Sequence, residues 1–153
     1  MFEVHEDDLS SEQTRGLLAL HLAGMHANSP SESVFALDLS GLEAPNVTVW
    51  TAWRKDRVAS IGALKMLVDG NGEVKSMRTH PDFTRKGAAA AILDRVISTA
   101  RNRGARRVSL ETGSGEAFEP AVALYRRRGF VNGPSFGDYE SSDFNQFLYL
   151  DLI

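Results

Sequence analysis

The chain has 153 residues, of which 42% are hydrophobic and 24% are charged, and its formal net charge is −3. This composition predicts one compact domain over residues 1–153 with its own hydrophobic core, and the acidic balance argues against broad nucleic-acid binding. The chain contains no cysteine, so a disulfide framework, thiolate zinc sites and a cysteine acyl-enzyme are excluded.

The first twenty residues do not have the pattern of a signal peptide. They carry Glu3, Glu6, Asp7 and Asp8 where a basic segment and an apolar core would be needed. No later segment has the length of a membrane span. We therefore expect a cytoplasmic protein that does not associate with membranes.

A short strand and a long helix are predicted at the start of the chain. Residues 1–5 can form the strand, and Ser10 or Ser11 is suited to cap a helix that ends near Asn28. A second, shorter helical stretch is expected at residues 31–39.

Three strands are predicted next, joined as an antiparallel meander. After a loop at residues 41–46, alternating apolar side chains indicate strands at 47–53 and 58–68. The Asp-Gly-Asn-Gly sequence at 69–72 favours a tight turn, because Asn and Gly tolerate positive φ, and it leads into a third strand at 73–79.

A basic turn built from small residues follows the third strand. Its glycine, Gly87, lets the backbone come close to a ligand, and the helix that starts near Ala88 directs unpaired N–H groups back at the turn. Arg85 and Lys86 add positive charge. The turn predicts an anion site, most simply for phosphate. A helix that starts after a basic loop for solubility alone would have the same composition.

The helix after this turn is predicted to end at Gly104, because its apolar stripe stops there. A strand at 106–112 follows, and a strand-helix-strand crossover makes it parallel to the strand at 73–79. Residues 113–116 are expected to form a mobile loop.

Pro120 suits the first turn of a further helix closed by Gly129, and alternation predicts a last strand at 146–152. The predicted fold class is α/β (α+β): a mixed, mainly antiparallel sheet of six to seven strands with a parallel βαβ section, flanked by about four helices. The last strand is a candidate edge for a homodimer.

The order of these motifs resembles the GNAT superfamily of acyl-CoA N-acyltransferases over most of residues 47–152. The turn and helix at 84–91 stand where the family has its Gln/Arg-x-x-Gly-x-Gly/Ala motif. The segment from Leu124-Tyr125 to Gly129-Phe130 is similar to the family's Leu-Tyr-x-x-x-Gly-Phe. Residues 75–79, 110–114 and 136–139 are similar to a bacterial subgroup of small GNAT enzymes whose acceptor is unassigned.

The resemblance implies that acetyl-CoA is the acyl donor, and that the family's CoA-binding positions fall on two segments of this chain. Backbone groups of a locally bulged strand would pair with the pantetheine, and the basic turn would hold the pyrophosphate. These positions are Met77, Arg78 and Thr79 on the strand, and Thr84, Arg85, Lys86, Gly87, Ala88 and Ala89 in the turn. Thr84 stands where the family has Gln or Arg, so the side-chain contact of that residue is either missing here or shifted to Arg85.

The resemblance also implies that Tyr125 faces the cofactor and protonates the CoA sulfur as it leaves. Acyl transfer to an amine further needs a base. Glu73 stands eleven residues before Thr84, where histone-modifying relatives place a catalytic glutamate, and strand alternation puts it on the same face as Lys75 and Met77. Glu111 on the next strand is an equal candidate, directly or through water.

The acceptor site is expected to involve the first helix and the ends of the strands. His21 and Met25 share a helix face, and Lys75, Arg78 and Tyr139 together could orient an acceptor carboxylate. No metal is expected, because His21 and His26 are five residues apart and no carboxylate accompanies them.

We expect transfer to the primary amine of a small, amino-acid-like acceptor by direct attack in a ternary complex. The sequence leaves two alternatives open: a non-catalytic acyl-CoA-binding sensor or accessory module, and an acetyltransferase acting on protein lysines or N-termini. A nucleotide phosphotransferase is disfavoured, because the Gly-Lys-Ser/Thr sequence is missing.

Overall fold

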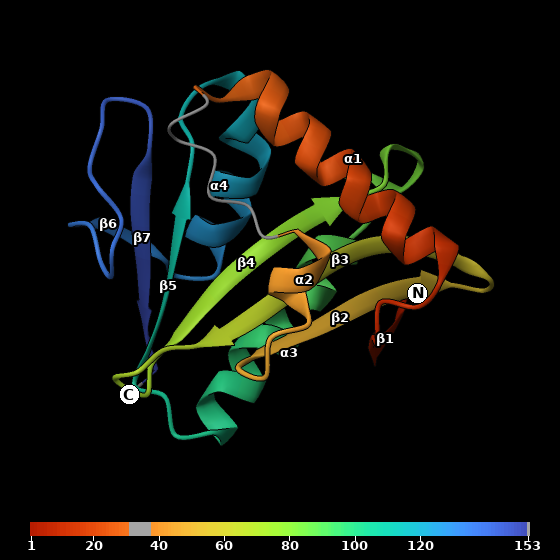
Figure 1. Cartoon of the computed structure of the whole chain (residues 1–153), viewed down its shortest axis with the longest axis horizontal. Coiled ribbons are helices and arrows are strands. Elements are labelled where there is room, and N and C mark those ends of the chain that lie inside the picture. Colours follow the sequence, from red (N-terminus) through yellow and green to blue (C-terminus); the bar gives the residue numbers. More distant parts are fainter. Residues whose placement is uncertain (31–37, 153) are drawn as a thin grey trace.

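The computed structural model of the chain describes residues 1–30 and 38–152. These residues form a seven-stranded sheet in the order β1-β2-β3-β4-β5-β7-β6 (Figure 1), in which β4 and β5 run parallel and every other neighbouring pair is antiparallel. The strands are β1 (Glu3–Glu6), β2 (Val47–Arg54), β3 (Arg57–Met66), β4 (Gly72–Thr79), β5 (Arg107–Thr112), β6 (Val131–Gly133) and β7 (Gln146–Asp151).

Helices cover both faces of the sheet, α1 and α2 on one face and α3 and α4 on the other (Figure 1). The helices are α1 (Glu12–Asn28), α2 (Leu39–Leu42), α3 (Ala88–Asn102) and α4 (Glu119–Arg127), with 3-10 turns at Pro81–Phe83 and Glu116–Phe118. The predicted fold class is confirmed. Among the described residues, no helix is both long and apolar enough to cross a membrane.

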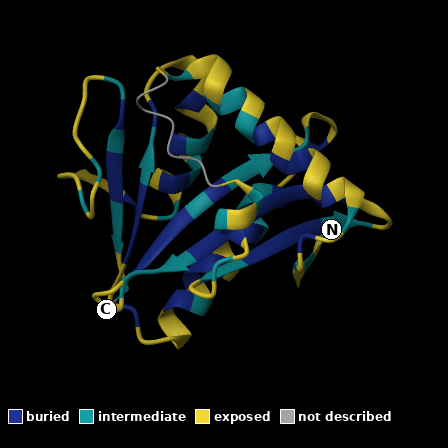
Figure 2. Cartoon of the chain, in the orientation of Figure 1, coloured by how far each residue is buried: buried dark blue, intermediate teal, exposed yellow. Residues whose placement is uncertain are grey.

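Each face of the sheet has its own hydrophobic core. The larger core joins α3 and α4 to the sheet and includes Val74, Ile92 and Leu110, and the smaller core lies under α1 and includes Leu17 and Ile61. Buried residues therefore follow the strands, while exposed residues lie on the outer sides of the helices (Figure 2). Since side chains alternate along a strand, the neighbours of Val74 and Leu110 point toward α1.

The local signals predicted most of the first half of the chain. Ser11 caps α1 by accepting a hydrogen bond from the Thr14 N–H (3.1 Å), and α1 ends at Asn28 as expected. Most of the helix predicted at 31–39 lies outside the described residues. The loop predicted at 41–46 starts later than expected, because Asp38 caps the short α2 by accepting a hydrogen bond from the Gly41 N–H (2.9 Å).

The second half of the chain differs from the prediction at three places. The last strand is not an edge, because β7 pairs with β5 on one side and with β6 on the other. The sequence did not reveal β6, whose three residues are all exposed and show no apolar alternation. The predicted loop at 113–116 is also shorter, because a 3-10 turn begins at Glu116 and buries Phe118 against Phe144.

A β-bulge interrupts β4, as expected. The register with β3 shifts between Ile61 and Ala63, and Ser76 adopts a positive φ of 59°. The extra residue turns the next side chain over, so Met77 packs in the α3 core instead of sharing a face with Glu73 and Lys75. The expectation that these three side chains share a face was therefore wrong.

Gly62 lies opposite the bulge and makes room for Met77. A Cβ at Gly62 would lie 2.4 Å from the Met77 sulfur and 2.5 Å from Ile92 Cγ2. Ile92 is completely buried and β-branched, so it has little freedom to move away. The bulge and the small residue opposite it are thus one packing arrangement.

We expect Gly62→Ala to lower the free energy of unfolding by about 1–3 kcal/mol, because the added methyl group overpacks this contact. Gly16→Ala is the matched control, since an added Cβ at this exposed position of α1 meets nothing within 4 Å. Alanine there should raise stability by up to about 1 kcal/mol. Urea unfolding of both variants tests the packing, and equal effects of the two substitutions would contradict it.

Candidate active site

Strands β4 and β5 pair over a very short distance. Only Gly72 with Val108 and Glu73 with Ser109 are in register, and the two strands then separate (Figure 1). Beyond Glu73, the side of β4 that faces β5 has no strand partner among the described residues. Its backbone N–H and C=O groups can therefore pair with an extended ligand.

The bulged part of β4 contains a second unsatisfied group. The Ser76 hydroxyl is buried and has no hydrogen-bond partner among the described residues. An unpaired buried hydroxyl costs about 1–3 kcal/mol, so a polar ligand lying along this strand would relieve that cost.

The basic turn before α3 has the geometry of an anion site. Arg85 and Gly87 adopt positive φ angles of 61° and 93°, and Gly87 occupies the N-cap of α3 without a side-chain hydrogen bond to the helix. The first hydrogen bond of α3 runs from the Ala91 N–H to the Gly87 carbonyl oxygen (3.0 Å). The preceding N–H groups of the helix are therefore available to an anion.

The side chains of the turn divide into two roles. The Thr84 hydroxyl donates to the Pro81 carbonyl oxygen (3.3 Å) and so helps to hold the turn. Arg85 and Lys86 are exposed beside the open end of α3. Positive charge at the turn is thus carried by these two residues.

Tyr125 lies on the opposite face of the sheet from α1. It is 6% exposed, belongs to the larger core and packs against Phe130 with a ring-centroid distance of 5.7 Å. Burial raises the pKa of Tyr125 well above its usual value, so its hydroxyl keeps its proton at neutral pH.

On the α1 side of β4, Glu73, Lys75 and Tyr139 form a closed triangle of polar contacts. The Lys75 ammonium donates to the Tyr139 oxygen (2.7 Å) and lies 3.4 Å from Glu73 Oε2, while the Tyr139 hydroxyl donates to the same Oε2 (2.5 Å). The side chains of Lys75 and Glu73 are only 9% and 4% exposed. Burial and the Glu73 carboxylate raise the pKa of Tyr139, which keeps this tyrosine a donor.

Glu111 is the other carboxylate of this region and lies on β5, across from the triangle. Burial, together with the negative charge of Glu73, raises the pKa of Glu111 to about 7, against the opposing influence of Lys75 and Asn145. A carboxylate with a pKa near 7 can take up a proton at neutral pH. Its chemistry therefore differs from that of Glu73, which is held by two donors.

Helix α1 contributes a histidine to the same face. Arg78 Nε donates to His21 Nδ1 (3.2 Å), and its Nη2 donates to the His21 carbonyl oxygen (3.4 Å). Burial, and then the charges of Arg78 and Lys75, lower the pKa of His21 to about 4. The imidazole is therefore neutral at physiological pH.

The predicted acceptor residues form two separate pairs among the described residues: Lys75 contacts Tyr139, and Arg78 contacts His21. Lys75, Arg78 and Tyr139 were expected to form one group, but no hydrogen bond among the described residues joins Arg78 to the other two. Met25 is half-buried on α1. The described residues contain no group of three His, Asp or Glu side chains suited to hold a metal ion.

Sequence reasoning missed Asn145, which orders the loop that carries Tyr139. Its Oδ1 accepts hydrogen bonds from the backbone N–H and the hydroxyl of Ser142 (both 2.8 Å), and its Nδ2 donates to the Glu140 carbonyl oxygen (3.0 Å). No local pattern could have indicated this role, because it depends on the fold of the loop.

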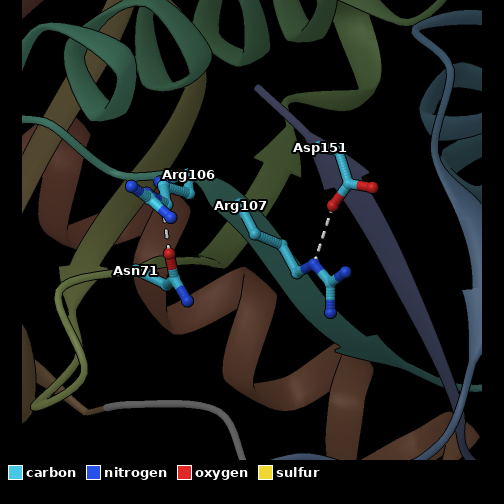
Figure 3. A pocket seen from close by; sticks show the side chains of 4 residues that line it. All are labelled: Asn71, Arg106, Arg107 and Asp151. Atoms are coloured by element: carbon cyan, nitrogen blue, oxygen red, sulfur yellow. Dashed lines mark hydrogen bonds and ion pairs between the residues drawn. The ribbon is translucent and has the colours of Figure 1, made fainter. Parts of the chain in front are cut away.

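A separate hollow lies at the other end of β5 (Figure 3). Arg107 pairs with Asp151 across β5 and β7 (2.8 Å), and Asn71 Oδ1 accepts a hydrogen bond from the Arg106 backbone N–H (3.2 Å). The side chains of Arg107 and Asp151 are 50% and 68% exposed, and their charges neutralise each other. This hollow therefore lacks the buried charged groups found near Glu111.

Comparison with known proteins agrees with this arrangement. The profile of the Acetyltransferase (GNAT) family matches residues 13–130. The chain belongs to the GNAT acetyltransferase family, and it is an acyltransferase of the acetyl-CoA-dependent class.

The chain is 42% identical over 152 residues to YedL, an uncharacterized N-acetyltransferase of Escherichia coli (strain K12). The matched region covers 99% of this chain and 96% of YedL. The chain is 47% identical over 133 residues to YsnE, an uncharacterized N-acetyltransferase of Bacillus subtilis (strain 168), covering 87% of this chain and 88% of that one.

Solved structures share the fold. A protein of Klebsiella pneumoniae described as an acyl-CoA N-acyltransferase superposes with a TM-score of 0.84 at 23% identity, covering 100% of this chain and 99% of that chain. An acetyltransferase of Bacillus subtilis, solved in complex with CoA, superposes with a TM-score of 0.74 at 18% identity, covering 100% of both chains.

The raised pKa of Glu111 makes a prediction about stability. Folding raises this pKa from 4.5 to about 7, so the folded state binds the proton more tightly than the unfolded chain does. The resulting stability is fully present below about pH 4.5 and is lost as the pH rises through about 7. Relative to Glu111→Gln, the wild type should lose about 1–2 kcal/mol of unfolding free energy between pH 5 and pH 8.

Urea unfolding at several pH values measures this difference. Glu116→Gln, at an exposed glutamate, is the control and should follow the wild type. Parallel pH profiles for the wild type and Glu111→Gln would show that the Glu111 carboxyl is not perturbed.

Proposed function

We propose that this protein transfers the acetyl group of acetyl-CoA to the primary amine of a small acceptor, by direct attack in a ternary complex. One observation carries the proposal: β4 and β5 separate beside a bulge, and Glu111, with its pKa raised to about 7, lies on β5 at this opening. This arrangement supports a proposal in which the unpaired part of β4 binds the donor and Glu111 acts as the base for the acceptor.

We propose two contact regions for acetyl-CoA. The pyrophosphate would bind the turn from Thr84 to Ala89, and the pantetheine would pair with the backbone of Met77, Arg78 and Thr79. Two features support this fit: the start of α3 has no side-chain cap, and the Ser76 hydroxyl has no hydrogen-bond partner within the described part of the chain. When bound, acetyl-CoA supplies a thioester carbonyl that an amine can attack.

We propose Glu111 as the base rather than Glu73. Glu73 Oε2 already accepts a hydrogen bond from Tyr139 and lies beside Lys75, so proton uptake there would break an internal network. Glu111 would accept the proton that the amine loses as its nitrogen bonds to the carbonyl carbon. The backbone N–H groups of the bulged strand would stabilise the carbonyl oxygen.

We propose Tyr125 as the acid. The carbon–sulfur bond breaks as the amide forms, and the departing thiolate takes a proton. Burial keeps the Tyr125 hydroxyl protonated, which is the state that an acid must have before it acts. The products are the N-acetylated amine and free CoA.

Acetyl-CoA at millimolar concentration should raise the Tm of the wild type. Lys86→Ala should weaken binding by about 3- to 10-fold, because it removes one charged contact to phosphate. Arg95→Ala removes the same charge from an exposed position further along α3 and should leave the affinity unchanged. A wild type that acetyl-CoA does not stabilise would contradict the proposed donor site, and equal losses in both variants would mean a general charge effect.

The pH dependence of turnover tests the base. We expect kcat/KM to rise with pH through an apparent pKa near 7, because Glu111 must be ionised to accept the proton. Glu111→Gln should lower turnover by about 10²- to 10⁴-fold and remove this limb of the profile. The acceptor's own ammonium adds a second limb at higher pH.

Two further variants separate the roles in the same assay of thiol release. In Glu73→Gln, kcat/KM should still rise with pH through an apparent pKa near 7. Tyr125→Phe should lower turnover without changing that apparent pKa. A limb that disappears in Glu73→Gln and persists in Glu111→Gln would assign the base to Glu73.

A further inference from the structure

The Arg78 guanidinium is held by a neutral partner instead of an acid. Its Nε donates to His21 Nδ1 at 3.2 Å, and Nη2 donates to the His21 carbonyl oxygen at 3.4 Å. His21 is 6% exposed, and because its Nδ1 accepts a hydrogen bond, its proton resides on Nε2. The contact therefore orients Arg78 without neutralising it.

The positive charge of Arg78 has no carboxylate partner among residues 1–30 and 38–152. Lys75, on the same face of β4, differs in this respect, because Glu73 lies 3.4 Å from its ammonium and Tyr139 accepts its hydrogen bond. Arg78 is half-buried, and this burial lowers its pKa. A partly buried cation without a counter-ion is costly, so an anion from outside the chain would be bound favourably.

The position of Arg78 indicates which ligand supplies that anion. The bulge returns Arg78 to the α1 face, the face of Glu73 and Lys75, while the turn at Gly87 lies beyond the end of β4. In the donor site proposed above, the charged phosphates of acetyl-CoA bind at that turn. The anion at Arg78 therefore belongs to the acceptor.

We propose that Arg78 binds a carboxylate of the acceptor, so that the acceptor is an amino acid with both a carboxylate and a primary amine. This inference rests on the acetyl transfer proposed above. A guanidinium has five N–H donors, and two are used on His21. The donors on Nη1 and Nη2 that remain form the planar fork that fits a carboxylate.

Gly24 on α1 sets the place of this guanidinium. A Cβ at Gly24 would lie 2.6 Å from Arg78 Nη2 and 3.2 Å from both Cζ and Nη1. Any side chain at this position would therefore displace the fork. His21 and Gly24, one turn apart on α1, are positioning residues for Arg78.

The test compares α-amino and ω-amino acids with their amides as acceptors, in an assay of thiol release from acetyl-CoA. The wild type should favour the best amino acid over its amide by about 10- to 100-fold in kcat/KM, the worth of a charge-assisted hydrogen bond. Arg78→Gln should remove this preference. Arg103→Gln, at an exposed arginine that bonds Thr48, should keep it.

The outcomes separate this inference from the proposed function. Acetylation of amides as fast as, or faster than, amino acids by the wild type would overturn the carboxylate site and leave acetyl transfer standing. A preference that survives Arg78→Gln would place the carboxylate elsewhere and overturn the inference. Failure to acetylate any amine would contradict the proposed function itself.

Gly24→Ala tests the positioning role. We expect the preference for amino acids over amides to fall by about 10-fold or more, because the displaced guanidinium no longer meets the carboxylate, and kcat/KM should therefore fall more for the amino acids than for the amides. A merely structural defect would lower both classes of acceptor together. Gly16→Ala, on the same helix with open space around it, should retain the full preference, and loss of preference in both variants would contradict the role of Gly24.

Discussion

The short pairing of β4 with β5 is the constraint on which the rest of the site depends. The crossover through α3 brings the two strands together at Gly72 and Glu73, and the antiparallel pairing of β5 with β7 over its whole length then holds β5 away from β4. A sheet that separates in this way presents backbone donors and acceptors inside the fold. It also places Glu73 and Glu111 on neighbouring strands whose pairing stops where the site begins.

The bulge at Ser76 determines which side chains enter the site. In an unbroken strand Arg78 would share the face of Val74 and point into the α3 core, where an unpaired charge would be costly. The extra residue reverses this arrangement, so that Met77 fills the core and Arg78 meets His21. Gly62, opposite the bulge, makes the reversal possible by leaving room for Met77.

The two cations of the site differ in their partners. Lys75 lies beside Glu73 and donates to Tyr139, whereas Arg78 donates to His21 and has no carboxylate partner among residues 1–30 and 38–152. The two carboxylates of the site, Glu73 and Glu111, also differ in their surroundings. Glu73 belongs to the internal network, whereas burial raises the pKa of Glu111, which suits the base role proposed for it above. One partly buried site can thus hold opposite charges without cancelling all of them.

The sequence by itself determined the order of the elements other than β6, a helix cap at Ser10 or Ser11, the antiparallel meander, the parallel crossover and the turn at Gly87, because each depends on local periodicity or on backbone preferences. It also indicated that Glu73 and Lys75 lie on one face of the sheet. Only the tertiary structure decided their partners, since Lys75 and Tyr139 are 64 residues apart and Arg78 and His21 are 57 apart. It likewise decided the side on which Met77 packs and the interior place of β7, because a bulge and an exposed three-residue strand leave no periodic signal while burial depends on contacts between distant segments.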